Sequence, residues 1–490
     1  MGLYSGNRRE LDNDFIFSTV QTISKKDHLG AFKKDHFDYI IIDESHRSGT
    51  QSYHNLIDYF TPKFLLGMTA TPERTDGNDI FKLYDYNIAY EIRLNQAMEE
   101  EMLSPFHYYG VSDLTIDDSQ KDDLTEFNYL TSDERVLQII NKANFYGSDN
   151  GITRGLIFCN RNEEAQKLSE KLNKSGLRTL ALSGNSSDEE RSLAIQKLES
   201  DSISQKIDYI LTVNIFNEGI DIPKVNQIIL LRPTESTIVF IQQLGRGLRK
   251  ADEKSYLTVI DFIGNYNNNY LIPIALYGDS SYNKDRLRKL ISEGSRETPG
   301  TSTINFDRIS KEKIFQSIDN ANMKLLKELK EDYNYLKNRL GKTPMMMDFI
   351  ETKTRDPFLF IEYSRSYFNF VNKVESDKIK ITESASLLLE YFSKEINNGK
   401  RIEESIILEY LINDGETSVL KIQQSILDKF DISSSINTIQ SAIDNLNFKF
   451  IREKQDKKLL SVNKIHKTNL ITINSNKIVP TTQFKESLKE

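Results

Sequence analysis

The clearest hydrophobic pattern in the chain is the continuous apolar run Tyr39–Ile42, which is followed directly by two acids, Asp43 and Glu44. An unbroken run rich in β-branched residues predicts a strand that is buried on both faces of a parallel sheet. Open α/β sheets bind ligands at the carboxyl ends of their strands, so the two carboxylates stand where a ligand is expected. A strand that ends in a solvated Asp-Glu turn is the alternative that this stretch alone leaves open.

Strand and helix patterns alternate on both sides of this run. Residues 15–22 predict a strand and a turn, residues 53–60 a helix, and residues 64–67 another strand. From 128 to 275 helices and strands alternate again, which is the pattern of a second doubly wound sheet. The chain is therefore expected to contain two α/β lobes built on parallel sheets.

The pattern changes after residue 277. Residues 278–305 are rich in Gly, Ser, Thr and Pro, and we expect a linker or a loop-rich seam there. Leucines then recur at helical spacing between 323 and 340, which predicts a helix with a core-facing side. The aromatic-rich run 358–370 also indicates a buried helix rather than a base-stacking surface.

Residues 402–463 carry three helical patterns followed by two short strands. The helices are expected near 403–413, after a cap at Thr417, and after 433–435; the strands are expected at 448–452 and 459–462. This order suggests a winged helix. The third helix offers no arginine for base reading, so a packing module is an equal alternative. Four cations of the expected hairpin favour an auxiliary grip on nucleic acid: Arg452, Lys454, Lys457 and Lys458.

Composition narrows the class of protein. Charged residues make up 28% of the 490 and the formal net charge is -8, so any nucleic-acid surface must be local. The single cysteine, Cys159, excludes an internal disulfide and is expected to be a buried hydrophobe. No apolar run is long enough to span a bilayer and no signal peptide is present, which together suggest a soluble cytoplasmic protein without a membrane partner.

Five stretches resemble the motifs of the superfamily 2 helicases, the DEAD/DEAH-box group, in the family's order. They are residues 43–46 (Asp-Glu-Ser-His, motif II), 69–72 (motif III), 155–159 (motif IV), 217–223 (motif V) and 242–249 (motif VI). Each motif is weak or moderate alone, but five in the correct order are specific. The resemblance covers residues 15 to 275 and implies two RecA-like lobes that bind ATP and Mg²⁺ between them.

The resemblance also implies roles for individual residues. Asp43 would hold Mg²⁺, Glu44 would polarise the attacking water, and Arg249 would be the arginine finger. The remaining catalytic and nucleotide-binding candidates are His46, Gln242, Arg246, Gly219 and Asp221. A helix from Val239 is expected to align Gln242, Arg246 and Arg249 on one face. The candidates for nucleic-acid contact and coupling are Thr19, Gln21, Thr69, Thr71 and Ser183.

One expected motif is missing. A nucleotide-binding sheet of this type needs a Gly-rich loop with Lys and Ser/Thr to hold the phosphates, and none of the 42 residues before Asp43 forms it. The single Gly-Lys-Thr, at 341–343, follows a helical pattern and precedes Pro344, so we interpret Gly341 as a helix C-cap. The first lobe is therefore expected to be incomplete and the chain to be truncated at its amino end.

A weaker resemblance points to a bacterial, restriction-type subgroup that often carries a phospholipase-D-like nuclease domain. It favours DNA over RNA and suggests a nuclease domain or subunit as partner. Two rival interpretations stay open: a non-catalytic binding subunit derived from a helicase, and a double-stranded DNA translocase of a restriction or anti-phage complex. The expected domains are a partial first lobe (1–103), a second lobe (104–277), a linker (278–305), a helical domain (306–400) and a winged helix with a basic tail (401–490).

Overall fold

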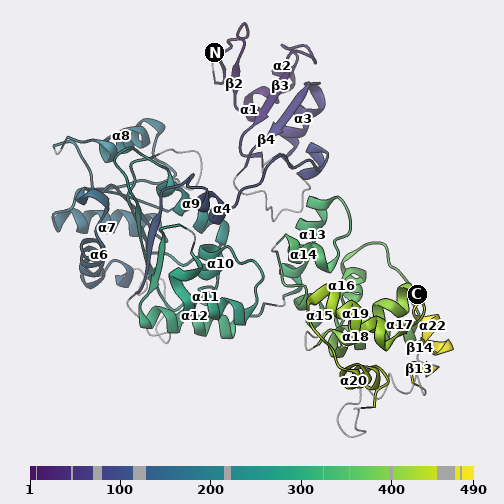
Figure 1. The fold of residues 1–490 in the computed structure, drawn as a ribbon. Coiled ribbons are helices and arrows are strands. Elements are labelled where there is room, and N and C mark those ends of the chain that lie inside the picture. The colour runs from purple at the N-terminus through teal and green to yellow at the C-terminus, as the bar shows by residue number, and fades with distance from the viewer. Residues whose placement is uncertain are drawn as a thin grey trace. The chain divides into compact units, whose positions relative to one another are not determined.

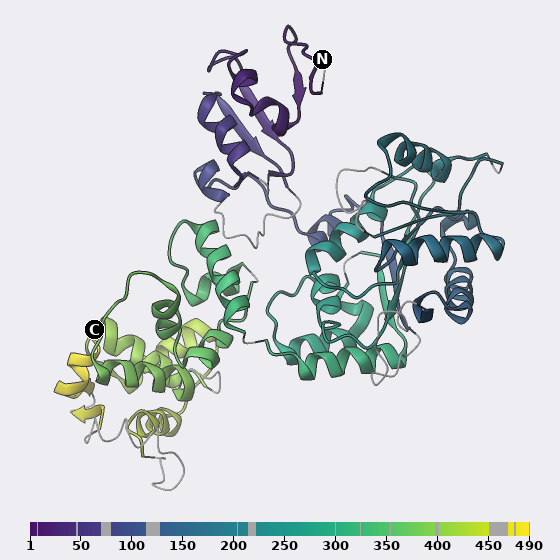
Figure 2. The same ribbon diagram turned by 180° about the vertical axis from the view of Figure 1, so that it is seen from behind.

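The computed structural model describes most of the chain and divides it into two compact units. The described residues are 1–6, 8–45, 48–69, 80–113, 128–202, 204–213, 222–298, 300–323, 325–352, 354–396, 401–449, 469–474 and 477–489. One unit comprises residues 1–323 and 335–343, and the other comprises 324–334 and 344–490. Figures 1 and 2 show the elements of each unit, coloured along the chain.

The amino-terminal part of the first unit contains two short parallel strand pairs. Strand β1 (Gly2–Tyr4) pairs with β2 (Ile16–Ser18), and β3 (Tyr39–Ile42) pairs with β4 (Phe64–Gly67). The helices are α1 (Val20–Ile23), α2 (Lys26–Leu29) and α3 (Gln51–Tyr59). One core joins these elements, and its buried members are Tyr4, Ile23, Leu29, Phe32, Leu56 and Phe60.

The prediction that β3 is buried on both faces is wrong. The side chains of Tyr39 and Ile41 are 70% and 62% exposed, and Phe64 on the neighbouring β4 is 49% exposed. Among the described residues β3 pairs with β4 alone, and the helical core packs against the other face, through Ile40. An apolar run typical of a fully covered strand is therefore covered on one side only.

The second lobe is built on a seven-stranded parallel sheet with the order β11-β5-β10-β9-β6-β8-β7. Its strands are β5 (Phe106–Ser112), β6 (Gly155–Phe158), β7 (Thr179–Ala181), β8 (Tyr209–Thr212), β9 (Gln227–Leu230), β10 (Leu257–Ile263) and β11 (Thr303–Phe306). The central strands β6, β8, β9 and β10 are buried along their whole length. This lobe is the RecA-like α/β fold that the sequence predicts.

Helices cover both faces of this sheet (Figure 1). On one face α6 (Asp133–Tyr146) and α7 (Asn162–Lys174) pack on alternate strand residues, including Ile157 and Ile229. On the other face lies α9 (Thr237–Leu248), whose Phe240 contacts the ring of Tyr108. The remaining helices of the lobe are α4 (Leu94–Glu99), α8 (Asp188–Glu199), α10 (Leu271–Tyr277), α11 (Lys284–Glu293) and α12 (Arg308–Asn320).

The linker predicted at 278–305 is wrong. This segment contains α11 and strand β11, and β11 extends the seven-stranded sheet by pairing in parallel with β5. Ser302 Oγ accepts a hydrogen bond from the backbone N–H of Phe106 at 3.0 Å, which ties the segment to the sheet. The Gly, Ser and Thr residues belong to short turns around these elements, and composition alone did not distinguish such turns from a linker.

The carboxyl-terminal unit begins with helices. They are α13 (Leu326–Leu340), of which residues 335–340 belong to the first unit, α14 (Met346–Glu351), α15 (Phe358–Ser364), α16 (Tyr367–Val374) and α17 (Glu383–Tyr391). Helix α13 ends before Gly341, whose φ of +65° confirms the expected C-cap. The single helix expected over 358–370 is two helices, because Arg365 adopts φ +71° between them. Phe360 and Phe370 are buried, as expected of a core.

The last part of this unit has three helices and a small antiparallel sheet. The helices are α18 (Glu403–Asn413), α19 (Val419–Phe430) and α20 (Ile436–Leu446), and the strands are β12 (Thr417–Ser418), β13 (Ile471–Asn474) and β14 (Lys477–Pro480). The sheet order is β12-β14-β13. The strands that the sequence predicts at 448–452 and 459–462, with all four hairpin cations, lie almost entirely outside the described residues. The described hairpin is a later one.

Candidate functional site

The two acids lie in a tight turn at the carboxyl end of β3. Glu44 adopts φ +50°, which is uncommon for a residue other than glycine, and its backbone N–H donates to Asp43 Oδ1 at 2.9 Å. The side chain of Asp43 is exposed and that of Glu44 is half-buried. Left-handed backbone at a non-glycine residue tends to occur at functional sites, because neighbouring structure has to hold it in place.

Backbone hydrogen bonds hold this turn against the end of β4. Ser45 N–H donates to the carbonyl of Met68, and Met68 N–H donates to the carbonyl of Ile42, both at 2.9 Å. Thr69 follows directly and is half-buried. The first part of the proposed motif II is thus in contact with the strand end that leads to motif III. His46 and Thr71 lie outside the described residues.

The remaining candidate of the first lobe for nucleic-acid contact is the segment after β2. Thr19 is the residue before α1, and its hydroxyl lies 2.8 Å from that of Thr22. Gln21 is an exposed residue within α1. Both residues therefore follow the carboxyl end of a parallel strand, as Asp43 and Glu44 do.

In the second lobe, the candidates of motif VI are carried by α9. Gln242 and Arg246 lie in this helix and are half-buried. The expectation that Arg249 shares their helical face is wrong, since the helix ends at Leu248 and Arg249 is extended, with ψ 139°. Ser104 holds the chain there: its N–H donates to the Leu248 carbonyl at 2.7 Å, and its hydroxyl donates to the Arg249 carbonyl at 3.1 Å. Arg249 is exposed.

Of the other second-lobe candidates, Ser183 lies in a described turn. Ser183 follows β7; its hydroxyl accepts from Asn185 N–H at 3.3 Å, and its own N–H donates to Ser186 Oγ at 3.1 Å. Gly219 and Asp221 lie outside the described residues, so the two ends of their segment, Val213 and Ile222, are the nearest described positions.

A buried ionic cluster near the carboxyl ends of the strands was missed from the sequence. The guanidinium of Arg135, with no exposed surface, donates to Asp113 Oδ2 at 2.9 Å and to Glu164 Oε1 at 3.1 Å. It also donates to the carbonyls of Leu130 and Leu231. Burial works to lower the pKa of Arg135, but the two carboxylates outweigh it and raise that pKa. Burial also raises the pKa of Glu164.

A second buried acid lies within the sheet. Asp261 on β10 accepts a hydrogen bond from the hydroxyl of Tyr108 on β5 at 2.6 Å, and both residues are buried. Burial raises the pKa of Asp261 to about 7, against the lowering effect of the Tyr108 hydrogen bond. Because Asp261 lies in a long apolar strand, no sequence pattern marks it as a titrating group.

The donor set fits a magnesium ion held jointly with a nucleotide. Within the described ranges, no group of three or more His, Cys, Asp or Glu side chains is placed to hold a metal by itself. Mg²⁺ commonly takes one or two carboxylates and completes its shell with phosphate and water. The exposed carboxylate of Asp43 at a strand end meets that requirement.

Of the described helices, none is long and apolar enough to cross a bilayer.

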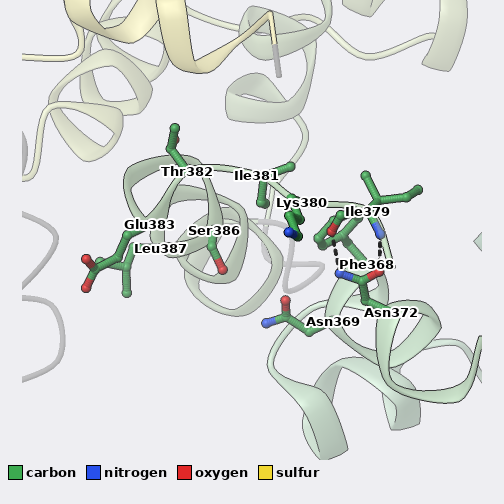
Figure 3. Close-up of a pocket in the computed structure, with 10 residues that line it drawn as sticks. All are labelled: Phe368, Asn369, Asn372, Ile379, Lys380, Ile381, Thr382, Glu383, Ser386 and Leu387. Carbon is green, nitrogen blue, oxygen red and sulfur yellow. Dashed lines mark hydrogen bonds between the residues drawn. The ribbon is translucent and has the colours of Figure 1, made fainter. Parts of the chain in front are cut away.

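The carboxyl-terminal unit has a hollow of about 500 Å³ between α16 and α17 (Figure 3). The lining residues are Phe368, Asn369, Asn372, Ile379, Lys380, Ile381, Thr382, Glu383, Ser386 and Leu387. The side chain of Asn372 exchanges two hydrogen bonds with the backbone of Ile379, at 2.7 and 2.8 Å. This polar wall thus serves the turn between the two helices, and we assign it no ligand.

Three protein families match separate parts of the chain. Residues 1–74 match a family described as the res subunit of type III restriction enzymes, and residues 134–251 match the helicase conserved C-terminal domain. These two matches support a restriction-type helicase of superfamily 2. Residues 329–490 match a domain of unknown function, DUF8090.

Several curated proteins are similar to this chain over about half of its length. The putative ATP-dependent helicase IRC3 of Saccharomyces cerevisiae is 28% identical over 265 residues, 52% of this chain and 37% of the relative. A 51.5 kDa protein of a Lactococcus phage is 25% identical, over 50% of this chain and 53% of its own length. A subunit of the type I restriction endonuclease EcoAI of Escherichia coli is 27% identical, over 47% and 32%. The chain thus spans between about a third and a half of the length of these relatives.

Solved structures are also similar to this chain. A fragment of a putative HsdR subunit from Vibrio vulnificus has a TM-score of 0.42 and 22% identity, over 53% of this chain and 50% of that chain. The type ISP restriction-modification enzyme LlaBIII bound to DNA has a TM-score of 0.42 and 16% identity, over 87% and 35%.

Proposed function

We propose that this chain is part of an ATP-driven motor that moves on DNA. The observation that carries the proposal is the turn at the end of β3, where Asp43 precedes the left-handed Glu44 and the backbone is tied to the end of β4. The matches to two helicase-related families and the position of Arg246 on α9 support it. ATP and Mg²⁺ are the proposed substrate and metal.

Each proposed role follows from the chemistry of its side chain. The Asp43 carboxylate holds the metal, which when bound neutralises charge on the phosphates. The Glu44 carboxylate orients the attacking water and draws on its proton, and the neighbouring His46 is assigned to the same site by the resemblance. Arg246 and Arg249 are permanently charged, and their planar forks match phosphate oxygens. Gln242, Gly219 and Asp221 complete the proposed contacts from the second lobe.

Hydrolysis would be coupled to movement through the contacts at strand ends. The Ser45–Met68 hydrogen bond joins the acid turn to the segment that begins with Thr69. A change at the nucleotide can therefore reach the carboxyl end of β4, and with it Thr71. Thr19, Gln21 and Ser183 form the proposed nucleic-acid surface. DNA is favoured over RNA because the relatives include restriction enzymes.

The proposed motor needs a phosphate-binding loop that this sequence does not contain. Parallel sheets are covered on both faces, yet Tyr39, Ile41 and Phe64 expose an apolar face of β3 and β4. A strand-and-helix segment carrying a Gly-rich loop would cover that face and bring backbone N–H groups to the phosphates beside Asp43. We call this chain together with such a segment the completed motor.

DNA-stimulated ATP hydrolysis tests the proposal. The chain alone should hydrolyse ATP very poorly, because the β- and γ-phosphates lack most of their ligands. The completed motor should hydrolyse ATP at rates that rise when duplex DNA is added. Helicase-like turnover by the chain alone, or none by the completed motor with DNA, would contradict the proposal.

Two other functions remain as candidates. A non-catalytic subunit would bind nucleic acid or a partner without turnover in any combination, and the missing loop favours it. A double-stranded DNA translocase of a restriction complex would hydrolyse ATP and displace a third strand from a triplex without separating the duplex. The similarity to restriction subunits favours this translocase over an unwinding enzyme.

A further inference from the structure

Lys254 makes an unusual set of contacts between two parts of the second lobe. Its ammonium donates to three backbone carbonyls: Pro223 at 2.8 Å, Gly247 at 3.0 Å and Val225 at 3.1 Å. Pro223 and Val225 lie just before β9, at the end of the connection that begins after β8. Gly247 lies in the last turn of α9, the helix that carries Arg246. One side chain therefore joins the end of this connection to the end of the arginine helix.

The surroundings explain why a cation is suited to this place. The last carbonyls of a helix lack intrahelical partners and carry the negative end of its dipole, so a lysine there satisfies and neutralises them. The helix is also packed tightly: a Cβ atom on Gly247 would meet Leu257 Cδ1 at 2.5 Å. The end of α9 is thus fixed against the sheet, and Lys254 fixes the β8–β9 connection to it.

A second cation makes the corresponding link at the other end of the sheet. Arg232 follows β9, and its Nη1 donates to the carbonyl of Val213, where the same connection leaves β8. With the side-chain amide of Gln243 on α9 turned by 180°, the orientation that satisfies its hydrogen bonds, its oxygen accepts from Arg232 Nε at 3.2 Å. Arg232 therefore links the described beginning of the β8–β9 connection to α9, and Lys254 links its described end to the same helix.

We infer that Lys254 is a positioning residue, which holds the end of the β8–β9 connection and the arginine-bearing helix α9 in one fixed relationship. The inference rests on the proposed function for its catalytic meaning, since that function assigns nucleotide contacts to this connection and to this helix. Misplacement of a catalytic group by about 1 Å can cost roughly a hundred-fold in rate. Lys254 itself touches backbone, and it acts through the residues that it aligns.

Hydrogen exchange on the full chain tests the coupling without nucleotide. Lys254→Met keeps the apolar stem and removes the three hydrogen bonds. It should raise amide exchange by at least about ten-fold in two separate peptides, one covering 222–226 and one covering 246–250. Lys254→Arg should restore part of the protection. Lys167→Met, at an exposed position of α7, is the matched control and should change neither peptide. Unchanged exchange in Lys254→Met, or a change in one peptide only, would overturn the inference.

The pH dependence of the same exchange gives an independent reading. Burial lowers the pKa of Lys254 to about 8, while the charge of Asp149 raises it. Its hydrogen bonds go to uncharged carbonyls of α9 and of the segment before β9. Above pH 8 the neutral amine has two hydrogens for three carbonyls, so protection in both peptides should fall, relative to Lys254→Arg. Parallel profiles of the two proteins up to pH 9 would contradict a coupling that depends on the ammonium.

Turnover by the completed motor separates this inference from the proposed function. Lys254→Met should lower kcat by about ten-fold or more and leave KM for ATP nearly unchanged, because alignment rather than binding is impaired. A Lys254→Met motor with the kcat of the unmodified motor would overturn the inference. If the unmodified motor shows no turnover, the proposed function fails, and the exchange experiment alone decides the role of Lys254.

Discussion

Arg135 and Glu164 form an ion pair in which neither side chain is exposed to solvent, with Nη1 and Oε1 3.1 Å apart. The pair joins α6 to α7, and Glu164 also accepts from the backbone N–H of Asn160, just beyond β6, at 2.8 Å. Asp113, which follows β5, binds the same guanidinium. The cluster therefore fixes α6, α7 and the carboxyl ends of β5 and β6. This edge of the sheet carries the proposed motifs of the second lobe.

Removal of the Arg135 charge should destabilise the second lobe strongly. Arg135→Met leaves two buried carboxylates without their cation, and breaking such a cluster typically costs about 3–5 kcal/mol of unfolding free energy. Arg178→Met is the control, since Arg178 pairs with Asp208 at a partly exposed site and such pairs contribute at most about 1 kcal/mol. Urea unfolding of the three proteins measures the difference. Equal losses in both variants would contradict this account of the cluster.

Asp261 should make the stability of the lobe fall between acid and neutral pH. Its folded-state pKa of about 7 lies above the ordinary value of 3.8, so the folded chain keeps a proton there that the unfolded chain releases. The unfolding free energy therefore decreases as pH rises from about 4 to 7, and the whole penalty is present above pH 7.

Asp261→Asn should remove this penalty, because the amide oxygen can still accept from Tyr108. The variant should gain about 2–3 kcal/mol more, relative to the unmodified chain, at pH 8 than at pH 5. Denaturant unfolding at the two pH values measures it, with Asp252→Asn at an exposed turn as control. A gain of the same size at both pH values would show that Asp261 does not titrate in this range.

The carboxyl-terminal tail is predicted to act as an auxiliary grip on duplex DNA. Replacing Arg452, Lys454, Lys457 and Lys458 by Ala should weaken binding and flatten its salt dependence, by a log–log slope of about 0.9 for each phosphate that is no longer neutralised. Affinity should vary little with sequence, since α20 carries no arginine. Titration of both proteins at two salt concentrations decides the question. Equal binding would favour a packing or partner domain.

Much of the second lobe could be predicted from sequence because its strands are apolar runs bounded by turns. Cys159 is buried as expected, and Ser132, a residue type that favours N-caps, caps α6 by accepting from Arg135 N–H at 3.2 Å. Beyond this lobe, the cap at Gly341 was equally predictable, since it joins a helical pattern to a glycine and a proline. These features are local, so neighbouring residues suffice to predict them.

The failures concern features that depend on distant residues. Whether Tyr39 and Ile41 are covered depends on what packs on the sheet, which an apolar run does not reveal. The place of β11 depends on its pairing with β5, almost 200 residues earlier. Lys254 and Arg135 are polar residues whose importance lies in carbonyls and carboxylates far along the chain. The sequence offered no periodicity or motif that could have marked them.

We propose that Glu44 from the first lobe and Arg249 from the second act on the same ATP molecule. Steady-state ATP hydrolysis by the completed motor with duplex DNA, measured beside equilibrium ATP binding, tests it most directly. Glu44→Gln and Arg249→Ala should each retain nucleotide binding and lose turnover, Arg249→Ala by roughly 10³-fold or more as for other arginine fingers. Near-normal turnover in either variant would contradict the claim.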